Sequence, residues 1–249
     1  MDDELAVQAA MNNALWCDAV CRAHGVPTLF ADDAWVGRGI GPRFYPNLVT
    51  LSVAGVEEQM RLVSELRGSL GVWGWGVKDS FKVLDLVPHG FRSVLDGQWV
   101  CGREVDVSDG RPVRGLSTRR VDSADGLRGW ESAWSVGQSQ HERTVRVFLP
   151  ALLEDPDIAF FSVMDGPEVV AGLAANRGGG VIGVTNLFIR SSERWIVRPC
   201  LALAAALWPG LLLVGYVSDK EMFTLHRWLG FRDIVGELRV WRFVGDDRP

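Results

Sequence analysis

The chain has few cysteines, few lysines and no long uninterrupted hydrophobic run. Its 249 residues include four cysteines, which are Cys17, Cys21, Cys101 and Cys200. Four are too few for a disulfide framework, so we expect reduced thiols and a cytoplasmic protein. The longest strongly apolar stretch, about 199–217, is broken at Trp208-Pro209-Gly210. It falls short of the roughly 20 residues that a membrane-spanning helix needs, and the first residues lack a signal-peptide pattern. We therefore expect no membrane association.

Positive charge comes almost entirely from arginine, because lysine occurs only at Lys78, Lys82 and Lys220. We interpret this scarcity as a composition bias rather than a functional signal. The net charge of −5 and the pI of about 5.4 argue against broad electrostatic binding of nucleic acid. Hydrophobic content of 47% and charged content of 23% are typical of a globular protein with one large or two small domains.

A metal site is a weak alternative for the first helix. Cys17 and Cys21 lie four positions apart and share a helix face, and His24 follows them. A structural zinc ion needs four ligands, and no second Cys/His pair lies nearby in the sequence. We therefore interpret both cysteines as small buried side chains and expect no metal.

The N-terminal third reads as an alternation of helices and strands. The glycine-rich segment 36–41 resembles a phosphate-binding turn, but prolines and extended chain follow it instead of a helix. We therefore predict a surface loop there. The other predicted elements are helix 5–24, strand 47–53, helix 56–70, strand 71–77, helix 79–89 and strand 93–102.

Residues 102–114 are polar and rich in glycine and proline, which favours a boundary between domains. A helix beyond it should be capped by Asp122 or Ser123 and run through Leu127, Trp130 and Trp134. The remaining predictions are strand 115–121, helix 142–152, strands 158–164, 168–175 and 181–189, helix 198–208, strand 211–217, helix 220–229 and a strand from 231.

The segment Leu211–Trp241 carries a resemblance to a known family. Its helix places residues on the pattern Asn-x-x-Ala-x-x-Leu-Tyr-x-x-x-Gly-Phe, at Asp219, Met222, Leu225, His226, Gly230 and Phe231. Leucine and Gly-Phe match this pattern of the GCN5-related N-acetyltransferase (GNAT) superfamily, whereas asparagine and tyrosine are replaced. The order β-α-α-β-β-β-α-β-α-β from Gly115 to Phe243 is also the GNAT order. The resemblance implies an α/β (α+β) GNAT-like acyl-CoA N-acyltransferase fold, with a mixed central sheet flanked by helices.

An internal repeat extends this resemblance to the first third. At a constant shift of 140 positions, Val77, Asp79 and Gly90-Phe91-Arg92 coincide with Val217, Asp219 and Gly230-Phe231-Arg232. We interpret residues 1–105 as a truncated GNAT-like domain and 113–249 as a GNAT-like acyltransferase domain. The alternative is an unrelated α/β extension.

In GNAT enzymes, acyl-CoA lies between two central parallel strands, which here are 181–189 and 211–217. The resemblance implies that the end of the first strand, Asn186, Leu187, Phe188 and Ile189, receives the pantetheine arm. The pyrophosphate turn then corresponds to 194–199. Arg194 matches its leading position, but Val197 and Pro199 replace its two small residues. Arg194 and Arg198 could pair with a phosphate by charge, or they could be solvated surface residues.

The resemblance also supplies catalytic candidates. The family's tyrosine general acid is replaced by His226, and a histidine with its usual pKa of about 6.5 can serve in either proton direction. The alternative is a partly exposed helical histidine with no task. Asp219 could orient an amine or a water, or could simply cap a helix. Glu142, beside His141, is a weaker candidate for a general base.

The resemblance therefore implies an acyl-CoA-dependent N-acyltransferase. An amine, from a small molecule or a peptide, would attack the thioester of acetyl-CoA or another acyl-CoA directly in a ternary complex. A homodimer is compatible with the sequence. Two alternatives stay open: a binding or scaffolding protein of the same fold that has lost turnover, and a transferase that uses another acyl donor such as an aminoacyl-tRNA.

Overall fold

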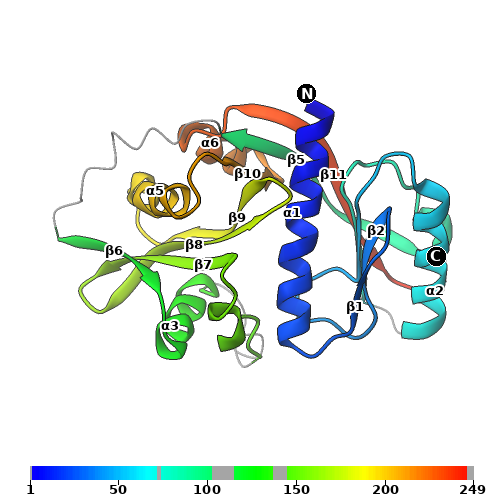
Figure 1. The fold of residues 1–249 in the computed structure, drawn as a ribbon, viewed down its shortest axis with the longest axis horizontal. Helices are drawn as coiled ribbons and strands as arrows, with labels where there is room; N and C mark the ends of the chain where they lie inside the picture. Colours follow the sequence, from blue (N-terminus) through cyan, green and yellow to red (C-terminus); the bar gives the residue numbers. More distant parts are fainter. Residues whose placement is uncertain (1, 72–73, 103–114, 137–144, 246–249) are drawn as a thin grey trace. The chain divides into compact units, whose positions relative to one another are not determined.

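The computed structural model describes residues 2–71, 74–102, 115–136 and 145–245. The chain divides into two compact units (Figure 1). Unit 1 comprises Met1–Trp99, Tyr216–Asp219 and Ile234–Pro249, and unit 2 comprises Val100–Gly215 and Lys220–Asp233. The predicted division at 105 and 113, and the internal repeat, stay predictions, since 103–114 lie outside the described residues.

Unit 1 is a sheet covered by one helix on each face. Its strands follow the order β1-β2-β3-β4-β11-β5, in which β3 and β4 are parallel and β4 and β11 antiparallel. The elements are α1 (Asp2–Ala23), β1 (Thr28–Phe30), β2 (Ala34–Gly37), β3 (Leu48–Thr50), α2 (Val56–Leu70), β4 (Gly76–Asp79), the 3₁₀ helix η1 (Val87–His89), β5 (Phe91–Gly102) and β11 (Asp233–Phe243).

Successive side chains along these strands point to opposite faces of the sheet, and each face forms its own hydrophobic core. Val36, Leu48 and Val77 pack with α2, whereas their neighbours Trp35 and Val49 pack with α1. The two helices therefore bury opposite faces of the same sheet.

Unit 2 contains an antiparallel meander followed by one parallel strand. Its strands follow the order β10-β9-β8-β7-β6. Its elements are β6 (Leu116–Val121), α3 (Ala124–Trp134), η3 (Pro150–Leu153), β7 (Ile158–Asp165), β8 (Glu168–Gly178), β9 (Val181–Ile189), η4 (Arg194–Val197), α5 (Arg198–Leu207), β10 (Leu212–Val217) and α6 (Lys220–Trp228). Mixed sheets flanked by helices confirm the predicted fold class.

Two predicted helices are wrong. In place of helix 79–89, the Asp79 carboxylate accepts the amides of Phe81 and Leu84 and folds the chain into a turn, and η1 follows. In place of helix 142–152, the described part contains only η3. The Glu131 carboxylate accepts the amides of Val147 and Phe148 at 2.6 and 3.4 Å, which holds them outside a helix. Residues 142–144 lie outside the described part.

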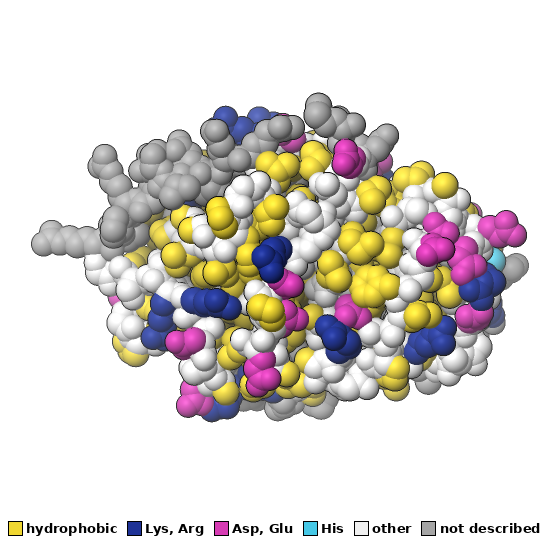
Figure 2. Space-filling view, viewed as in Figure 1, with side chains coloured by type: hydrophobic (Ala, Val, Ile, Leu, Met, Phe, Trp, Pro, Cys, Tyr) yellow, Lys and Arg dark blue, Asp and Glu magenta, His cyan; other side chains and the backbone are white. Residues whose placement is uncertain are grey.

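The segment 36–41 is only partly a loop, because Val36 and Gly37 are buried in β2. The β1–β2 hairpin that contains them escaped the sequence analysis. All four cysteines are buried free thiols, and burial was predicted for Cys17 and Cys21. Within the described residues, no helix is long and apolar enough to cross a membrane, and no acidic, histidine and cysteine side chains cluster as metal ligands. On the face that Figure 2 shows, basic and acidic side chains lie interspersed.

Lys78 is an unusual feature of the unit 1 core. Its side chain leaves β4 toward α1 and is only 4% exposed. Its ammonium nitrogen lies 3.8 Å from the ring centre of Tyr216 and 4.8 Å from that of Trp99, but no described carboxylate pairs with it. Burial lowers the pKa of Lys78 to about 8, although the nearby Cys17 thiol acts in the opposite direction. The aromatic rings replace only part of the lost hydration.

We predict that Lys78→Met stabilises the protein at neutral pH. An unfolded lysine keeps its proton up to about pH 10.5, whereas folded Lys78 loses it near pH 8, so the contribution of Lys78 to wild-type stability rises with pH between these values. The variant should gain of order 3 kcal/mol in free energy of unfolding at pH 7, and this advantage should shrink from pH 8 to 9.

Urea unfolding of both proteins between pH 6.5 and 9 measures this difference. Burial raises the pKa values of Cys17 and Cys21 to about 12, so these thiols ionise first in the unfolded state, but this effect is common to both proteins and cancels in their difference. Lys82→Met, which removes a lysine paired with Asp96 and Glu237, is the control and should change stability by less than about 1 kcal/mol. A pH-independent gain in Lys78→Met would contradict the explanation.

Candidate functional site

Strand β9 carries a bulge at its centre. Thr185 pairs with Ala174 of β8 and Phe188 pairs with Gly172, so Asn186 and Leu187 together face Leu173. Asn186 adopts a positive φ of 51°, a conformation that asparagine accepts more readily than most residues. A bulge of this kind bends the strand and redirects the side chains and amides beyond it.

The bulged half of β9 separates from β10. The parallel pairing joins only Leu212–Val214 to Val181–Gly183, although β9 continues to Ile189 and β10 to Val217. Among the residues that the structure describes in unit 2, β9 makes no ladder pair with β10 beyond Gly183, so backbone groups of this edge are available to a ligand. The half-buried Asn186, Leu187, Phe188 and Ile189 all lie on this segment. The GNAT resemblance predicts that the pantetheine arm lies along this segment, and this assignment stays a prediction.

His226 lies behind this opening, within unit 2. It is buried at 3% exposure, and its ring meets that of Phe231 edge-on at 5.3 Å. Nδ1 lies 2.9 Å from the Met222 carbonyl oxygen, which can only accept, so Nδ1 carries a proton and Nε2 is the basic atom of the neutral ring. A Cβ on Gly215 of β10 would lie 3.8 Å from Nε2 and 3.3 Å from the Val184 carbonyl oxygen. Glycine at 215 thus brings the imidazole against the strands where they separate.

The predicted pyrophosphate turn folds as η4 and the start of α5, and both of its arginines contact α6. The Arg194 guanidinium pairs with Glu221 at 2.5 Å, at the start of α6. Arg198 donates to the Trp228 carbonyl at 2.8 Å, at its end, and stacks on the Trp228 ring at 4.1 Å. Val197 is fully buried and helps form the core. Pro199, in the first turn of α5, supplies no amide.

The other catalytic candidates are less constrained by the structure. Asp219 is exposed and directly precedes α6. Glu142 lies outside the described residues, as does His141. Burial raises the pKa of the Cys200 thiol in α5, so this cysteine is protonated and unsuited to act as a nucleophile.

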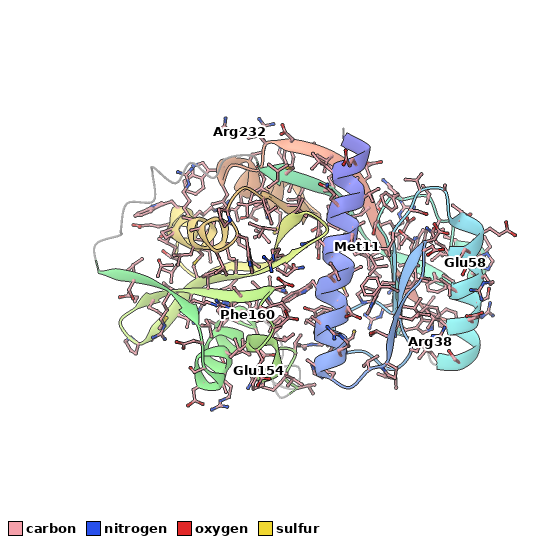
Figure 3. The ribbon with its side chains drawn as sticks, in the orientation of Figure 1. Met11, Arg38, Glu58, Glu154, Phe160 and Arg232 are labelled. Carbon is pink, nitrogen blue, oxygen red and sulfur yellow. The ribbon has the colours of Figure 1, made fainter. Side chains whose placement is uncertain are left out.

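Sequence reasoning missed several residues that shape the site. Gly215 and Glu221 act through contacts with residues distant in the sequence, and no local pattern marks them. Trp130 of α3 is another: its ring packs edge-on against Phe188 of β9 at 5.3 Å and against Phe160 of β7, labelled in Figure 3, at 5.1 Å. Its indole nitrogen donates to the Phe161 carbonyl at 3.0 Å. The many aromatic residues in the sequence of unit 2 were the signal that could have indicated this packing of Trp130.

Comparison with known proteins supports the fold. No protein-family model and no curated protein sequence matches the chain. Among solved structures, a GCN5-related N-acetyltransferase from Kribbella flavida has 17% identity and a TM-score of 0.58, with 93% of this chain and 95% of that chain covered. A candidate acetyltransferase of the GNAT family from Novosphingobium aromaticivorans has 10% identity and a TM-score of 0.57, with 96% and 99% covered.

A functionally unknown conserved protein from Staphylococcus epidermidis has 10% identity and a TM-score of 0.59, with 88% of this chain and 94% of that chain covered. At such low identities the likeness concerns the fold alone. The chain therefore has the GNAT fold.

We predict that Gly172→Ala disrupts the bulged region. An added Cβ would lie 2.6 Å from the Trp130 indole nitrogen, 2.7 Å from the Phe161 carbonyl oxygen and 3.0 Å from the Phe188 ring. Such overpacking should cost about 3 kcal/mol of unfolding free energy, measured by urea denaturation.

Gly129→Ala in α3 is the matched control. No atom lies within 4 Å of its added Cβ, so the change should be neutral or slightly stabilising. Equal stability losses in the two variants would refute the steric explanation.

Proposed function

We propose that the protein is an acyl-CoA-dependent N-acyltransferase whose cosubstrate, acetyl-CoA or another acyl-CoA, lies along the free edge of β9. The observation that carries the proposal is the bulge at Asn186 combined with the early end of the β9–β10 pairing. The opened edge offers backbone donors and acceptors in a row, which suits the amide-containing pantetheine arm. The GNAT fold supports the same assignment. We also infer that the protein acts in the cytoplasm.

The reaction proposed is direct transfer. The neutral nitrogen of a small-molecule or peptide amine attacks the thioester carbonyl carbon, the C–S bond breaks and the sulfur leaves as a thiolate. The amine proton must be removed and the thiolate must be protonated. Nε2 of His226 is proposed to accept the amine proton and, once protonated, to act as the acid that protonates the thiolate, while Asp219 or Glu142 would orient the amine or assist in removing its proton. The products are an amide and free coenzyme A.

A second candidate function is binding without turnover. The observation that favours it is the start of α5, where the buried Val197 and Pro199 stand in place of the small residues of a pyrophosphate turn. Fewer amides can then approach a phosphate, and Arg194 and Arg198 already have partners on α6. A chain with this defect could keep the fold and bind another partner at the same face.

Calorimetric titration with acetyl-CoA separates the two candidates. We expect saturable binding that Arg194→Ala weakens about tenfold, because the variant removes a charge-assisted contact to the pyrophosphate. Arg177→Ala is the matched control, since Arg177 is also about half exposed and pairs with Asp157 elsewhere in unit 2. Its affinity for acetyl-CoA should equal that of the wild type.

The absence of binding to acetyl-CoA and longer acyl-CoAs would rule out the enzyme and leave the binding protein. Equal affinity of Arg194→Ala and wild type would remove Arg194 from the pyrophosphate site.

A second prediction concerns His226. His226→Phe should lower kcat about 100-fold or more while leaving acetyl-CoA affinity within about twofold, as expected when proton transfer alone is lost. Because His226 is buried, the thermal unfolding midpoint of the variant is also measured, to show that the variant is folded. Unchanged kcat in a folded variant would exclude His226 from the reaction.

A further inference from the structure

Strand β1 is the last strand at one end of the unit 1 sheet. Its inner edge pairs with β2 in an antiparallel register that sets Leu29 opposite Val36. Among the residues that the structure describes, no strand pairs with its outer edge. An unpaired edge presents backbone amides and carbonyls in a row, which is a template for a further strand. The outer edge of β1 is therefore a candidate interaction surface.

The outward backbone groups of this edge belong to Thr28 and Phe30. The Ala31 amide donates to the Ala34 carbonyl at 2.8 Å, so these two residues form a hydrogen-bonded pair of the β1–β2 ladder. Such pairs recur at every second residue of an antiparallel ladder, so the amide and carbonyl of Leu29 also point toward β2. The amides and carbonyls of Thr28 and Phe30 point the other way.

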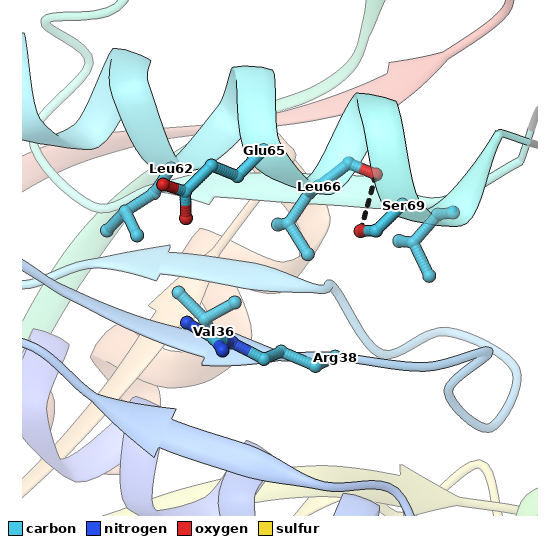
Figure 4. A pocket seen from close by; sticks show the side chains of 7 residues that line it. Val36, Arg38, Leu62, Glu65, Leu66 and Ser69 are labelled. Carbon is cyan, nitrogen blue, oxygen red and sulfur yellow. Dashed lines mark hydrogen bonds between the residues drawn. The ribbon is translucent and has the colours of Figure 1, made fainter.

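The two faces of the β1–β2 hairpin are already covered, so its edge is the part that stays available. Val36 and Leu66 of α2 belong to the core on one face (Figure 4), and Trp35 belongs to the α1 core on the other face. The side chains of β1 remain accessible, with Leu29 43% and Phe30 39% exposed.

The chain around β1 lacks the charges that usually keep two sheet edges apart. Residues 25–31, Gly-Val-Pro-Thr-Leu-Phe-Ala, contain no ionisable side chain. Ile40, which is 82% exposed, adds apolar surface nearby, because a Cβ on the preceding Gly39 would lie 3.4 Å from Cγ1 of Val26. Two copies of this edge can therefore meet without bringing like charges together.

We propose that β1 pairs with β1 of a second copy of this chain, antiparallel and about a two-fold axis at Leu29. This register sets Thr28 opposite the partner's Phe30 and Phe30 opposite the partner's Thr28, and each pair exchanges two hydrogen bonds. All the outward groups of both strands are then used, and a contact between identical patches closes at two chains.

The two Leu29 side chains meet at the axis as a non-hydrogen-bonded pair, the closer of the two kinds of pair. The edge is short, so the dimer buries less than about 1,200 Å² in total, and we expect a dissociation constant on the order of tens of micromolar.

Sedimentation velocity of the full chain, from about 5 to 500 µM, tests this dimer across the expected dissociation constant. The wild type should pass from monomer to dimer as its concentration rises. Leu29→Lys and Leu29→Glu should each stay monomeric, because each variant sets two like charges directly opposite one another. An equal mixture of the two variants should associate again, because opposite charges then meet at the axis.

Val94→Lys is the matched control, because Val94 of β5 is a strand residue of the same unit with 49% exposure. It should dimerise like the wild type. A wild type that stays monomeric throughout would overturn the proposal, and so would a dimer of either Leu29 variant alone. Failure of the mixed variants to associate would refute the two-fold register.

Hydrogen exchange of the wild type gives a readout that does not depend on the folding of any variant. The Thr28 and Phe30 amides should exchange more slowly at high than at low protein concentration. Exchange at these amides that does not change with concentration would contradict pairing through β1. None of these measurements involves acyl-CoA, so failure here and failure of the proposed function are separable.

Discussion

The candidate site depends on one constraint, which is that β9 leaves β10 after three paired residues on each strand. Parallel strands with continuous hydrogen bonding would leave no room between them. The bulge at Asn186 bends β9 away, and the packing behind it keeps the bend in place. Trp130 presses on Phe188, and Gly172 leaves the space in which both rings fit. The packing of Trp130, Phe188 and Gly172 therefore supports the bend of β9 that accompanies the gap.

Arg194 and Arg198, at the start of α5, can exchange their present partners for a ligand at a small energetic cost. Arg194 and Glu221 are about half and three-quarters exposed, and such a pair stabilises a protein by less than about 1 kcal/mol. A pyrophosphate carries more charge and could replace Glu221 at little cost. Pro199 and Val197 matter more, because a missing amide and a buried branched side chain cannot adjust to a ligand. Any acyl-CoA bound here would rely on arginine charge more than on backbone amides.

Local patterns predicted much of the fold but little of the site. Helix Val56–Leu70 and the Ser123 cap follow from periodicity and capping chemistry, which act within a few residues. The helix predicted at 79–89 failed because the Asp79 carboxylate outcompetes helical bonding for nearby amides. The positive φ of Asn186, the burial of His226 and the cation–aromatic contacts of Lys78 all arise from residues far apart in sequence, so no window of the sequence contains them.

Unit 1 also contains a parallel strand pair, β3 and β4, and its details differ from those of β9 and β10. Val49 pairs with Lys78, and directly beyond them the Ser80 amide donates to the Thr50 hydroxyl at 2.8 Å. A side chain therefore continues the link that a third backbone pair would make, and Thr50 and Ser80 are both fully buried. β3 and β4 therefore stay linked where their backbone pairing ends, whereas β9 and β10 separate where theirs ends. Among the described residues, the β3–β4 pair is therefore closed by a side chain at its end, whereas the β9–β10 pairing simply stops at Gly183 and Val214.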